Sequence, residues 1–298
     1  MERFELLREY TNGNYQVRLL EDGTKIRYTD GDEFFPEFPE SIDLKITNRC
    51  DRGCLMCHEK STKDGKHASL HHPFLTSLQA GTELAIGGGN PLEHPDLIPF
   101  LQRMKAKGIV CNMTVHQVHL VENLSFVQNL LDEKLIYGLG ISLSSSTYSD
   151  AIAAFCQKNK NAVLHVIAGI VSTEMLEKFY DKDLKLLILG YKRVGRGIDY
   201  YSTEIENGIA FLEKNILDIA KHFKVVSFDN LAILQLKMQS KVDDFDLLYM
   251  GDDGDFTMYV DLVKNEFAVS STCEKRFPIK ESIIEMFKTV RAEKRARA

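Results

Sequence analysis

The sequence predicts an α/β protein with a partial parallel (β/α)6-type barrel, preceded by a β-hairpin and followed by a hairpin and a helix. The first observation is that short apolar runs alternate with amphipathic segments from Ile42 to about residue 235, which is typical of βα units in a parallel sheet. The second is length. Six or seven such units in about 190 residues suit an incomplete barrel, because a closed eightfold barrel typically needs roughly 250 residues.

The first 39 residues are expected to form the N-terminal hairpin. Residues 15–20 and 24–28 have strand-like patterns on either side of Asp22-Gly23, and Asp-Gly is a strong hairpin signal. Pro36 and Pro39 end this segment. A hairpin edge can add a strand from a bound peptide, which slightly favours a peptide substrate.

Residues 40–235 form the predicted barrel. Apolar runs predict strands near residues 42–47, 83–86, 109–114, 137–143, 162–171, 185–190 and 224–229. Four apolar residues from Leu97 to Met104 recur at helical spacing and predict a helix that stops at Gly108. Another helix is expected to begin at Ser172.

Residues 236–298 are predicted to form a cap on the barrel. The alternation of strands and helices ends there, and residues 256–261 and 266–269 read as a second hairpin. A final helix is expected from about Lys280 to Arg295.

The composition argues against partners that require a strong positive charge or a membrane span. The chain has 37 basic and 43 acidic residues and a net charge of -6, so we expect no bulk nucleic-acid binding. Its apolar stretches fall well short of the roughly 20 residues that cross a bilayer. Six cysteines, three of them within eight residues, do not suit a secreted disulfide scaffold. We therefore expect a cytoplasmic protein that uses clustered thiols for metal.

The clustered thiols are Cys50, Cys54 and Cys57, which directly follow the first predicted barrel strand. Parallel barrels build their sites on loops at this end of the strands. Soft thiolates select zinc, copper(I) or iron-sulfur clusters, and three ligands on a four-iron cluster leave one iron open. An open iron can bind a further molecule, whereas a fully ligated cluster only passes electrons.

A second motif, Gly87-Gly88-Gly89-Asn90-Pro91, follows the next strand and opens a helix. Glycines there let the backbone come close to a ligand, and polar groups at the strand tip can meet charged ligand ends. A glycine-rich run alone is weak support, but this one lies at the same end of the barrel as the cysteines.

Together the CxxxCxxC and Gly-Gly-Asn-Pro motifs resemble those of the radical S-adenosylmethionine superfamily, over roughly residues 40–235. The resemblance implies one 4Fe-4S cluster on the three cysteines, with S-adenosylmethionine bound to the open iron. It further implies reductive cleavage to a 5'-deoxyadenosyl radical that abstracts hydrogen from a substrate. An external one-electron reductant of the flavodoxin or ferredoxin type is then required.

The same resemblance assigns cofactor contacts. The amino group of S-adenosylmethionine is expected at Gly88, Gly89, Asn90 and Pro91, although the family usually has a carboxylate where Asn90 stands. Met56 occupies the position of an aromatic residue that helps frame the adenine. Ser142 and Ser144, on the fourth strand tip, are candidate contacts to the ribose and the methionine carboxylate, or they cap the next helix.

Other candidates lie outside these motifs. Cys273 is a candidate hydrogen-atom donor, with a buried, inert thiol as the alternative. Cys111 and Cys156 are expected in the core. Relatives with extra clusters carry several more C-terminal cysteines, so we expect no auxiliary cluster. His116 is a candidate substrate contact or a solvated loop residue, and the basic loop with Lys192, Arg193 and Arg196 is a candidate anion site or a charged surface.

The substrate class stays open between a peptide and a small metabolite or nucleotide. Two rival functions also stay open. One is an activase that places a radical on a partner enzyme. The other is a non-catalytic iron-sulfur or zinc binding module, in which His58, next to Cys57, is the adjacent fourth ligand.

Overall fold

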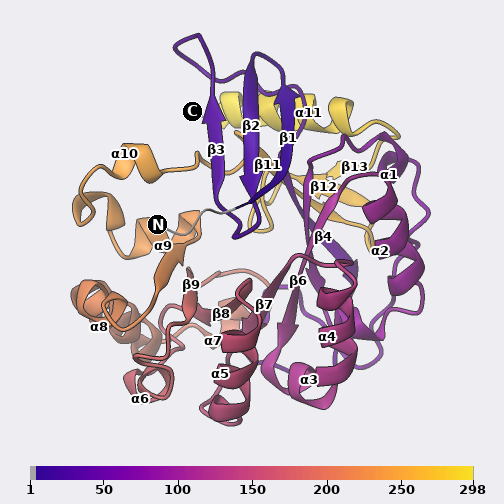
Figure 1. Ribbon diagram of the computed structural model, residues 1–298. Helices are drawn as coiled ribbons and strands as arrows, with labels where there is room; N and C mark the ends of the chain where they lie inside the picture. Colours follow the sequence, from indigo (N-terminus) through magenta and orange to yellow (C-terminus); the bar gives the residue numbers. More distant parts are fainter. Residues whose placement is uncertain (1–4, 298) are drawn as a thin grey trace.

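The computed structural model describes residues 5–297 and shows two β-sheets with helices packed around the larger one (Figure 1). The larger sheet has ten strands in the order β10-β9-β8-β7-β6-β5-β4-β11-β12-β13. Strands β4 to β10 follow the chain order and pair in parallel, with bounds Ser41–Thr47, Glu83–Gly88, Val110–His116, Gly138–Ser142, Ala162–Ile167, Lys185–Leu189 and Val225–Phe228.

All seven predicted strands are therefore confirmed in place and order. The fifth is shorter than predicted. It ends at Ile167 instead of residue 171, because Gly169 adopts a φ of +82° and the amides of Ile170 and Val171 bond back to the carbonyl of Ile167. The outer strands β10 and β13 do not pair with each other, so the described residues form no closed barrel.

The C-terminal hairpin is present, but it is not a separate cap. Strand β11 (Thr257–Asp261) pairs in parallel with β4, while β12 (Glu266–Ala268) and β13 (Phe277–Pro278) continue the same sheet antiparallel. Met258 and Val260 bury one face of β11 in the common core. The alternation in the sequence predicts the strand but does not say which neighbour it pairs with.

Helices connect the strands and cover one face of the sheet (Figure 1). Up to β8 they are α1 Phe74–Ser77, the 3-10 helix η1 Pro91–Glu93, α2 Leu97–Ala106, α3 Gln117–Glu122, α4 Leu124–Asp132 and α5 Ser149–Lys158. After β8 they are α6 Thr173–Glu177, α7 Gly197–Tyr200, α8 Thr203–Ala220, α9 Asn230–Gln235, the 3-10 helix η2 Met238–Ser240, α10 Phe245–Leu248 and α11 Ile283–Arg297. The helices predicted after Asp96, after Ser172 and at the C-terminus are confirmed.

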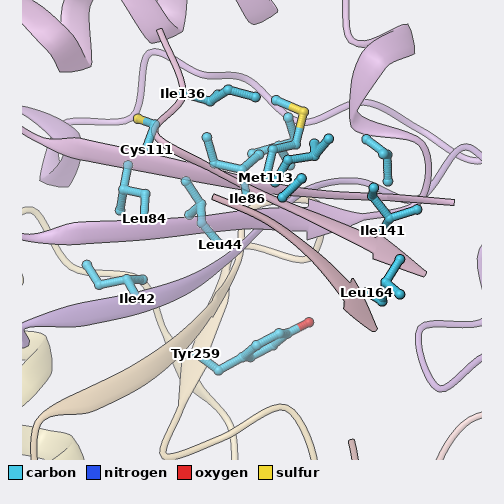
Figure 2. Packing of buried hydrophobic residues seen from close by; sticks show 14 of the residues in the cluster. Ile42, Leu44, Leu84, Ile86, Cys111, Met113, Ile136, Ile141, Leu164 and Tyr259 are labelled. Carbon is cyan, nitrogen blue, oxygen red and sulfur yellow. The ribbon is translucent and has the colours of Figure 1, made fainter. Parts of the chain in front are cut away.

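The two faces of the central strands differ. Leu44, Ile86 and Met113 belong to the core between the strands and the helices, and Figure 2 shows them packed together. Because side chains alternate along a strand, the intervening residues point the other way. We call that side the open face. Asp43 is exposed there although its neighbours on β4 are buried, so the open face remains accessible.

The N-terminal segment forms a three-stranded antiparallel sheet, β1 (Leu6–Asn12), β2 (Tyr15–Leu20) and β3 (Lys25–Tyr28), so the predicted hairpin lacked its first strand. This small sheet lies across the amino ends of the parallel strands. Lys25 pairs there with Glu83 at 2.6 Å, and Lys185 donates to the carbonyl of Asp22 at 3.1 Å. Within residues 5–297, no helix combines the length and apolarity needed to cross a membrane.

Candidate functional site

The three clustered cysteines lie on a long loop that leaves the carboxyl end of β4. Its two arms are joined by backbone hydrogen bonds: the amide of Cys50 donates to Thr62 at 2.8 Å, and the amide of Thr62 donates to Asn48 at 3.1 Å. A turn brings the amide of Cys57 to the carbonyl of Cys54 at 3.2 Å. All three thiols are unbonded to other cysteines and partly exposed. The loop therefore presents its thiols to solvent from a fixed backbone.

The spacing of these thiols bears on which metal they suit. Two thiolates on one zinc ion lie at most roughly 4.6 Å apart, since each Zn–S bond is about 2.3 Å. The three sulfur atoms do not all lie within 4.8 Å of one another, and the described residues bring only Cys50, Asp51 and His119 that close. The closest group of potential metal ligands among the described residues therefore joins one of the three thiols to Asp51 and His119.

His119 is a neighbour of the cysteines that the sequence did not reveal. Its Nε2 lies 2.7 Å from Oδ1 of Asp51, and hydrogen bonds from Arg52 and His119 lower the pKa of that carboxyl. His58, predicted as the adjacent zinc ligand, lies instead 3.4 Å from Glu59. No sequence pattern marks the His119 contact, because the two residues are 68 positions apart.

The glycine motif packs directly on the cysteine loop. The amide of Gly89 donates to Thr47 at 2.8 Å and that of Asn90 to Arg49 at 2.7 Å. Gly88 has a φ of +109°, and a Cβ on Gly88 or Gly89 would overlap the carbonyl of Thr47 or Arg49. These two glycines therefore allow the close packing of the motif on the cysteine loop, and their contact with a cofactor stays a prediction. Gly87 alone of the three faces open space.

Asn90 and Pro91 begin the short helix η1. Asn90 is buried, and its side chain accepts a hydrogen bond from Leu92 while donating to Glu93 Oε1 at 2.9 Å. Glu93 also pairs with Arg49 at 3.0 Å, one residue before Cys50. A carboxylate thus lies beside the motif although Asn90 itself has none.

The serine-rich tip of β7 is held by the neighbouring strand connection. Gln117, fully buried at the start of α3, accepts hydrogen bonds from the amides of Ser144 and Ser145, and Ser144 Oγ lies 3.0 Å from His116 Nε2. His116 also caps α3 through Nδ1. Ser144 and His116 are therefore engaged locally. Ser142 makes no side-chain hydrogen bond with the residues described and stays available on the open face.

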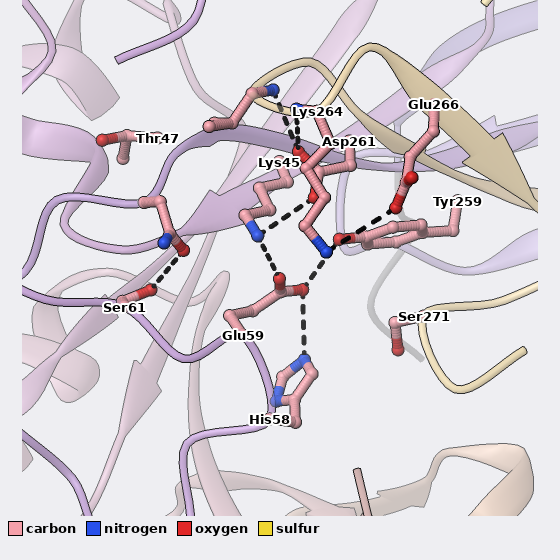
Figure 3. Close-up of polar contacts among 12 residues, drawn as sticks. Lys45, Thr47, His58, Glu59, Ser61, Tyr259, Asp261, Lys264, Glu266 and Ser271 are labelled. Carbon is pink, nitrogen blue, oxygen red and sulfur yellow. Dashed lines mark hydrogen bonds and ion pairs between the residues drawn. The ribbon is translucent and has the colours of Figure 1, made fainter. Parts of the chain in front are cut away.

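Beneath the cysteine loop lies a buried polar network (Figure 3). Lys45 on β4 pairs with Glu59 at 2.6 Å and with Asp261 on β11 at 3.0 Å, and Tyr259 donates to Glu59 at 2.9 Å. Burial alone would raise the pKa of Glu59, but His58 and Lys45 lower it. Lys45 thus lies between two carboxylates, and these contacts hold the base of the cysteine loop on β4 and β11.

The basic loop after β9 is also mostly engaged. Arg193 stacks over the ring of Tyr201 at 4.0 Å, and Lys192 donates to Ser271 at 2.9 Å. Arg196 donates to the carbonyls of Cys54 and Ser61. These partners are all uncharged, so the anion site stays a prediction, and Arg196 in addition holds the cysteine loop.

This arrangement can be compared with known proteins. No protein-family model and no curated protein sequence matches the chain. Among solved structures, SuiB from Streptococcus suis bound to S-adenosylmethionine superimposes with a TM-score of 0.63 over 88% of this chain and 69% of SuiB, at 13% identity. The chain has the fold of SuiB.

Two further SuiB structures agree. SuiB bound to its precursor peptide SuiA matches with a TM-score of 0.54 and 15% identity over 78% of this chain, and SuiB without a named ligand matches with 0.57 and 11% over 90%. The matched region spans 59% of the peptide-bound SuiB chain and 82% of the other. The resemblance inferred from the motifs is thereby confirmed at the level of the fold.

The other residues singled out from the sequence are Met56 and the three cysteines outside the loop, and they lie in different parts of the structure. Met56 is half-buried within the cysteine loop. Cys273 lines an open pocket of about 550 Å3 with Asp253 and Arg297, beside α11. Its role as a hydrogen donor stays a prediction. Cys111 and Cys156 are buried in the core, as expected, and burial raises the pKa of each thiol to about 12.

Proposed function

We propose that this chain is a radical S-adenosylmethionine enzyme that cleaves its cofactor reductively and modifies a peptide. The observation that carries the proposal is the packing of the glycine motif on a loop with three free, partly exposed thiols, in a fold that binds S-adenosylmethionine in SuiB. Cys50, Cys54 and Cys57 would hold a 4Fe-4S cluster. When bound and reduced, the cluster supplies the electron that breaks the sulfonium bond.

The chain's own groups then orient the cofactor. Gly87 leaves open space next to the cysteine loop, and Asn90 with Glu93 places a carboxylate near the end of β5. We assign the amino group of S-adenosylmethionine to the turn Gly88 to Pro91, beside which Glu93, already paired with Arg49 at 3.0 Å, is the neighbouring carboxylate. Ser142 stays the candidate contact to the ribose.

A substrate contact is proposed at His165 on the open face of β8. Its ring lies over Gly140, where a Cβ would overlap it, and it pairs in register with Ser142. Burial lowers the pKa of His165 to about 4, so the ring is neutral near pH 7, and it makes no hydrogen bond with any described residue. A neutral imidazole offers one donor and one acceptor. The peptide assignment follows SuiB, which binds a precursor peptide.

Anaerobic reconstitution with iron and sulfide, followed by dithionite and S-adenosylmethionine, tests the proposal by the yield of 5'-deoxyadenosine. Dithionite replaces the flavodoxin or ferredoxin that we expect in the cell. We expect product from the wild type and from Cys111→Ala, which removes a buried thiol of the core, and none from Cys54→Ala. A well-formed cluster that yields no 5'-deoxyadenosine would overturn the proposal.

The binding-module alternative has one observation in its favour, the close group of Cys50, Asp51 and His119. It predicts zinc as the bound metal and loss of that zinc in His119→Ala. The radical-enzyme proposal predicts that His119→Ala still takes up iron. Metal analysis of this variant separates a zinc module from the radical enzyme, and the 5'-deoxyadenosine assay separates a non-catalytic iron-sulfur module from it. No contact in the described structure favours the activase, which stays a prediction.

A further inference from the structure

We propose that Arg196 is a positioning residue that holds the three-cysteine loop in the shape needed to bind a cluster. Arg196 belongs to the loop after β9, and 139 residues separate it from Cys57 in the chain, so no local pattern joins them. The link to a cluster rests on the proposed function. The clamp on the loop itself rests only on the contacts of the described residues.

Three hydrogen bonds define the clamp. Arg196 Nε donates to the carbonyl of Cys54 at 3.0 Å, and Nη1 donates to that of Ser61 at 2.9 Å. The backbone amide of Arg196 donates to the carbonyl of Cys57 at 3.1 Å. The guanidinium therefore joins the cysteine turn to the returning arm of the same loop. A rigid planar fork suits this task, because it fixes two acceptors at once.

The residues on either side of Arg196 are fitted to the same surface. Gly195 has a φ of +63°, and a Cβ there would overlap the carbonyl of His58. A Cβ on Gly197 would overlap the carbonyl of Lys192, so this glycine permits the tight turn of the loop that carries Arg196. Gly195 thus permits a close backbone approach at residues 57–58, and the contact includes backbone as well as the long Arg196 side chain.

The clamp is anchored at its other end. Tyr191 is buried, and its hydroxyl donates to the carbonyl of Gly197 at 2.9 Å. The backbone of Tyr191 exchanges two hydrogen bonds with the side chain of Gln235, at 2.8 and 3.0 Å. The loop that carries Arg196 is therefore held against α9 and the end of β9. Through Arg196 it fixes the position of the cysteine loop relative to the sheet.

Arg193 provides a matched control. It lies on the same loop and has the same charge, but it stacks on Tyr201 and forms no hydrogen bond or ion pair with the cysteine loop among the described residues. Arg193→Gln and Arg196→Gln each remove one positive charge. Arg196→Lys keeps the charge and loses the fork.

Hydrogen exchange of the metal-free protein tests the clamp directly. We expect residues 50–62 to exchange at least about tenfold faster in Arg196→Gln, at an intermediate rate in Arg196→Lys, and at the wild-type rate in Arg193→Gln, because only broken loop contacts raise local opening. Wild-type exchange in Arg196→Gln, or equal acceleration in Arg193→Gln, would overturn the clamp.

The reconstituted protein tests its consequence for the cluster. Arg196→Gln should retain less iron, because it loses the side-chain contacts that hold the cysteine loop. It should also show a lower midpoint potential in an EPR redox titration, because a positive charge beside Cys54 favours the more negative, reduced form of the cluster. Arg196→Lys should lose iron while keeping the wild-type potential. An unchanged potential and iron content in Arg196→Gln would overturn this role. If even the wild type forms no cluster, the proposed function fails, while hydrogen exchange still decides whether Arg196 positions the loop.

Discussion

The two ends of the parallel strands use their polar side chains in opposite ways. At the amino ends, Glu40 is fully buried and accepts hydrogen bonds from Tyr15 at 2.6 Å and from Arg27 at 2.7 and 2.9 Å, with Lys25 at 3.1 Å. At the carboxyl ends, the thiols of Cys50, Cys54 and Cys57 are partly exposed and form no disulfide. A Cβ on Gly87 would face open space there. The closed end stabilises the fold, and the open end is left available for ligands.

The buried network around Lys45 marks the boundary between these regions. It lies toward the carboxyl end of β4, where Lys45 pairs with two carboxylates, Glu59 and Asp261. Above it, the thiols of Cys50, Cys54 and Cys57 are partly exposed and form no disulfide. The comparison therefore predicts that substitutions at the amino ends lower the free energy of unfolding. Substitutions on the cysteine loop should lower cofactor cleavage and leave that free energy nearly unchanged.

The largest expected effect is the loss of chemistry at the open end. Cys57→Ala should reduce 5'-deoxyadenosine formation to the level of protein without iron, because the proposed cluster would lose one of its three ligands. The metal-free variant should unfold within about 0.5 kcal/mol of the wild type, since the thiol is partly exposed and bonds to no other cysteine. Product assays and urea unfolding measure the two quantities. A stability loss as large as that of a core substitution would contradict the comparison.

The next effect is at the closed end. Glu40→Gln should lower the free energy of unfolding by about 3–5 kcal/mol, because it leaves Arg27 buried without its carboxylate and Lys25 with Glu83 alone. Glu9→Gln, which breaks an exposed pair with Arg18, is the matched control and should leave the free energy of unfolding nearly unchanged. Urea unfolding measures both. Iron uptake by folded Glu40→Gln should match the wild type, and a specific loss of iron binding would break the separation.

Substitutions of the neighbouring Gly87 and Gly88 should also separate an effect on cofactor binding from an effect on stability. Gly88→Ala should cost about 1–3 kcal/mol of stability, because Gly88 has a positive φ and its Cβ would overlap the Thr47 carbonyl. Gly87→Ala places a methyl group in open space and should leave stability nearly unchanged while weakening binding of S-adenosylmethionine. Thermal unfolding and equilibrium dialysis distinguish them. Equal stability losses would show that both glycines serve packing.

The smallest effect is the pH dependence of the closed end. Burial alone would raise the pKa of Glu40, but Arg27 and Lys25 lower it below its ordinary value of 4.5. Its stabilising contribution is therefore complete above about pH 4.5 and is lost as the pH falls through the folded-state pKa. Urea unfolding between pH 6 and pH 3 should show the stability gap between wild type and Glu40→Gln narrowing only toward the acid end. A gap that is constant with pH would contradict this assignment.

Local patterns were enough to predict most of the fold and the outline of the site. The seven parallel strands, the helix ending before Gly108 and the placement of Cys50, Cys54 and Cys57 after the first of those strands all follow from side-chain periodicity and turn residues within short windows. Strand β1 was missed, because its exposed and half-buried residues give no strong alternation.

The sequence by itself determined which residues form the parallel strands and where the two motifs fall, because period and spacing are properties of neighbouring residues. Only the tertiary structure decided that β11 pairs with β4, that His119 lies beside Asp51, and that Arg196 reaches Cys54 across 142 residues. These contacts depend on how the curved sheet returns distant loops to one end. A side chain's partner across such a distance is set by the packing of the whole domain, and no local pattern encodes it.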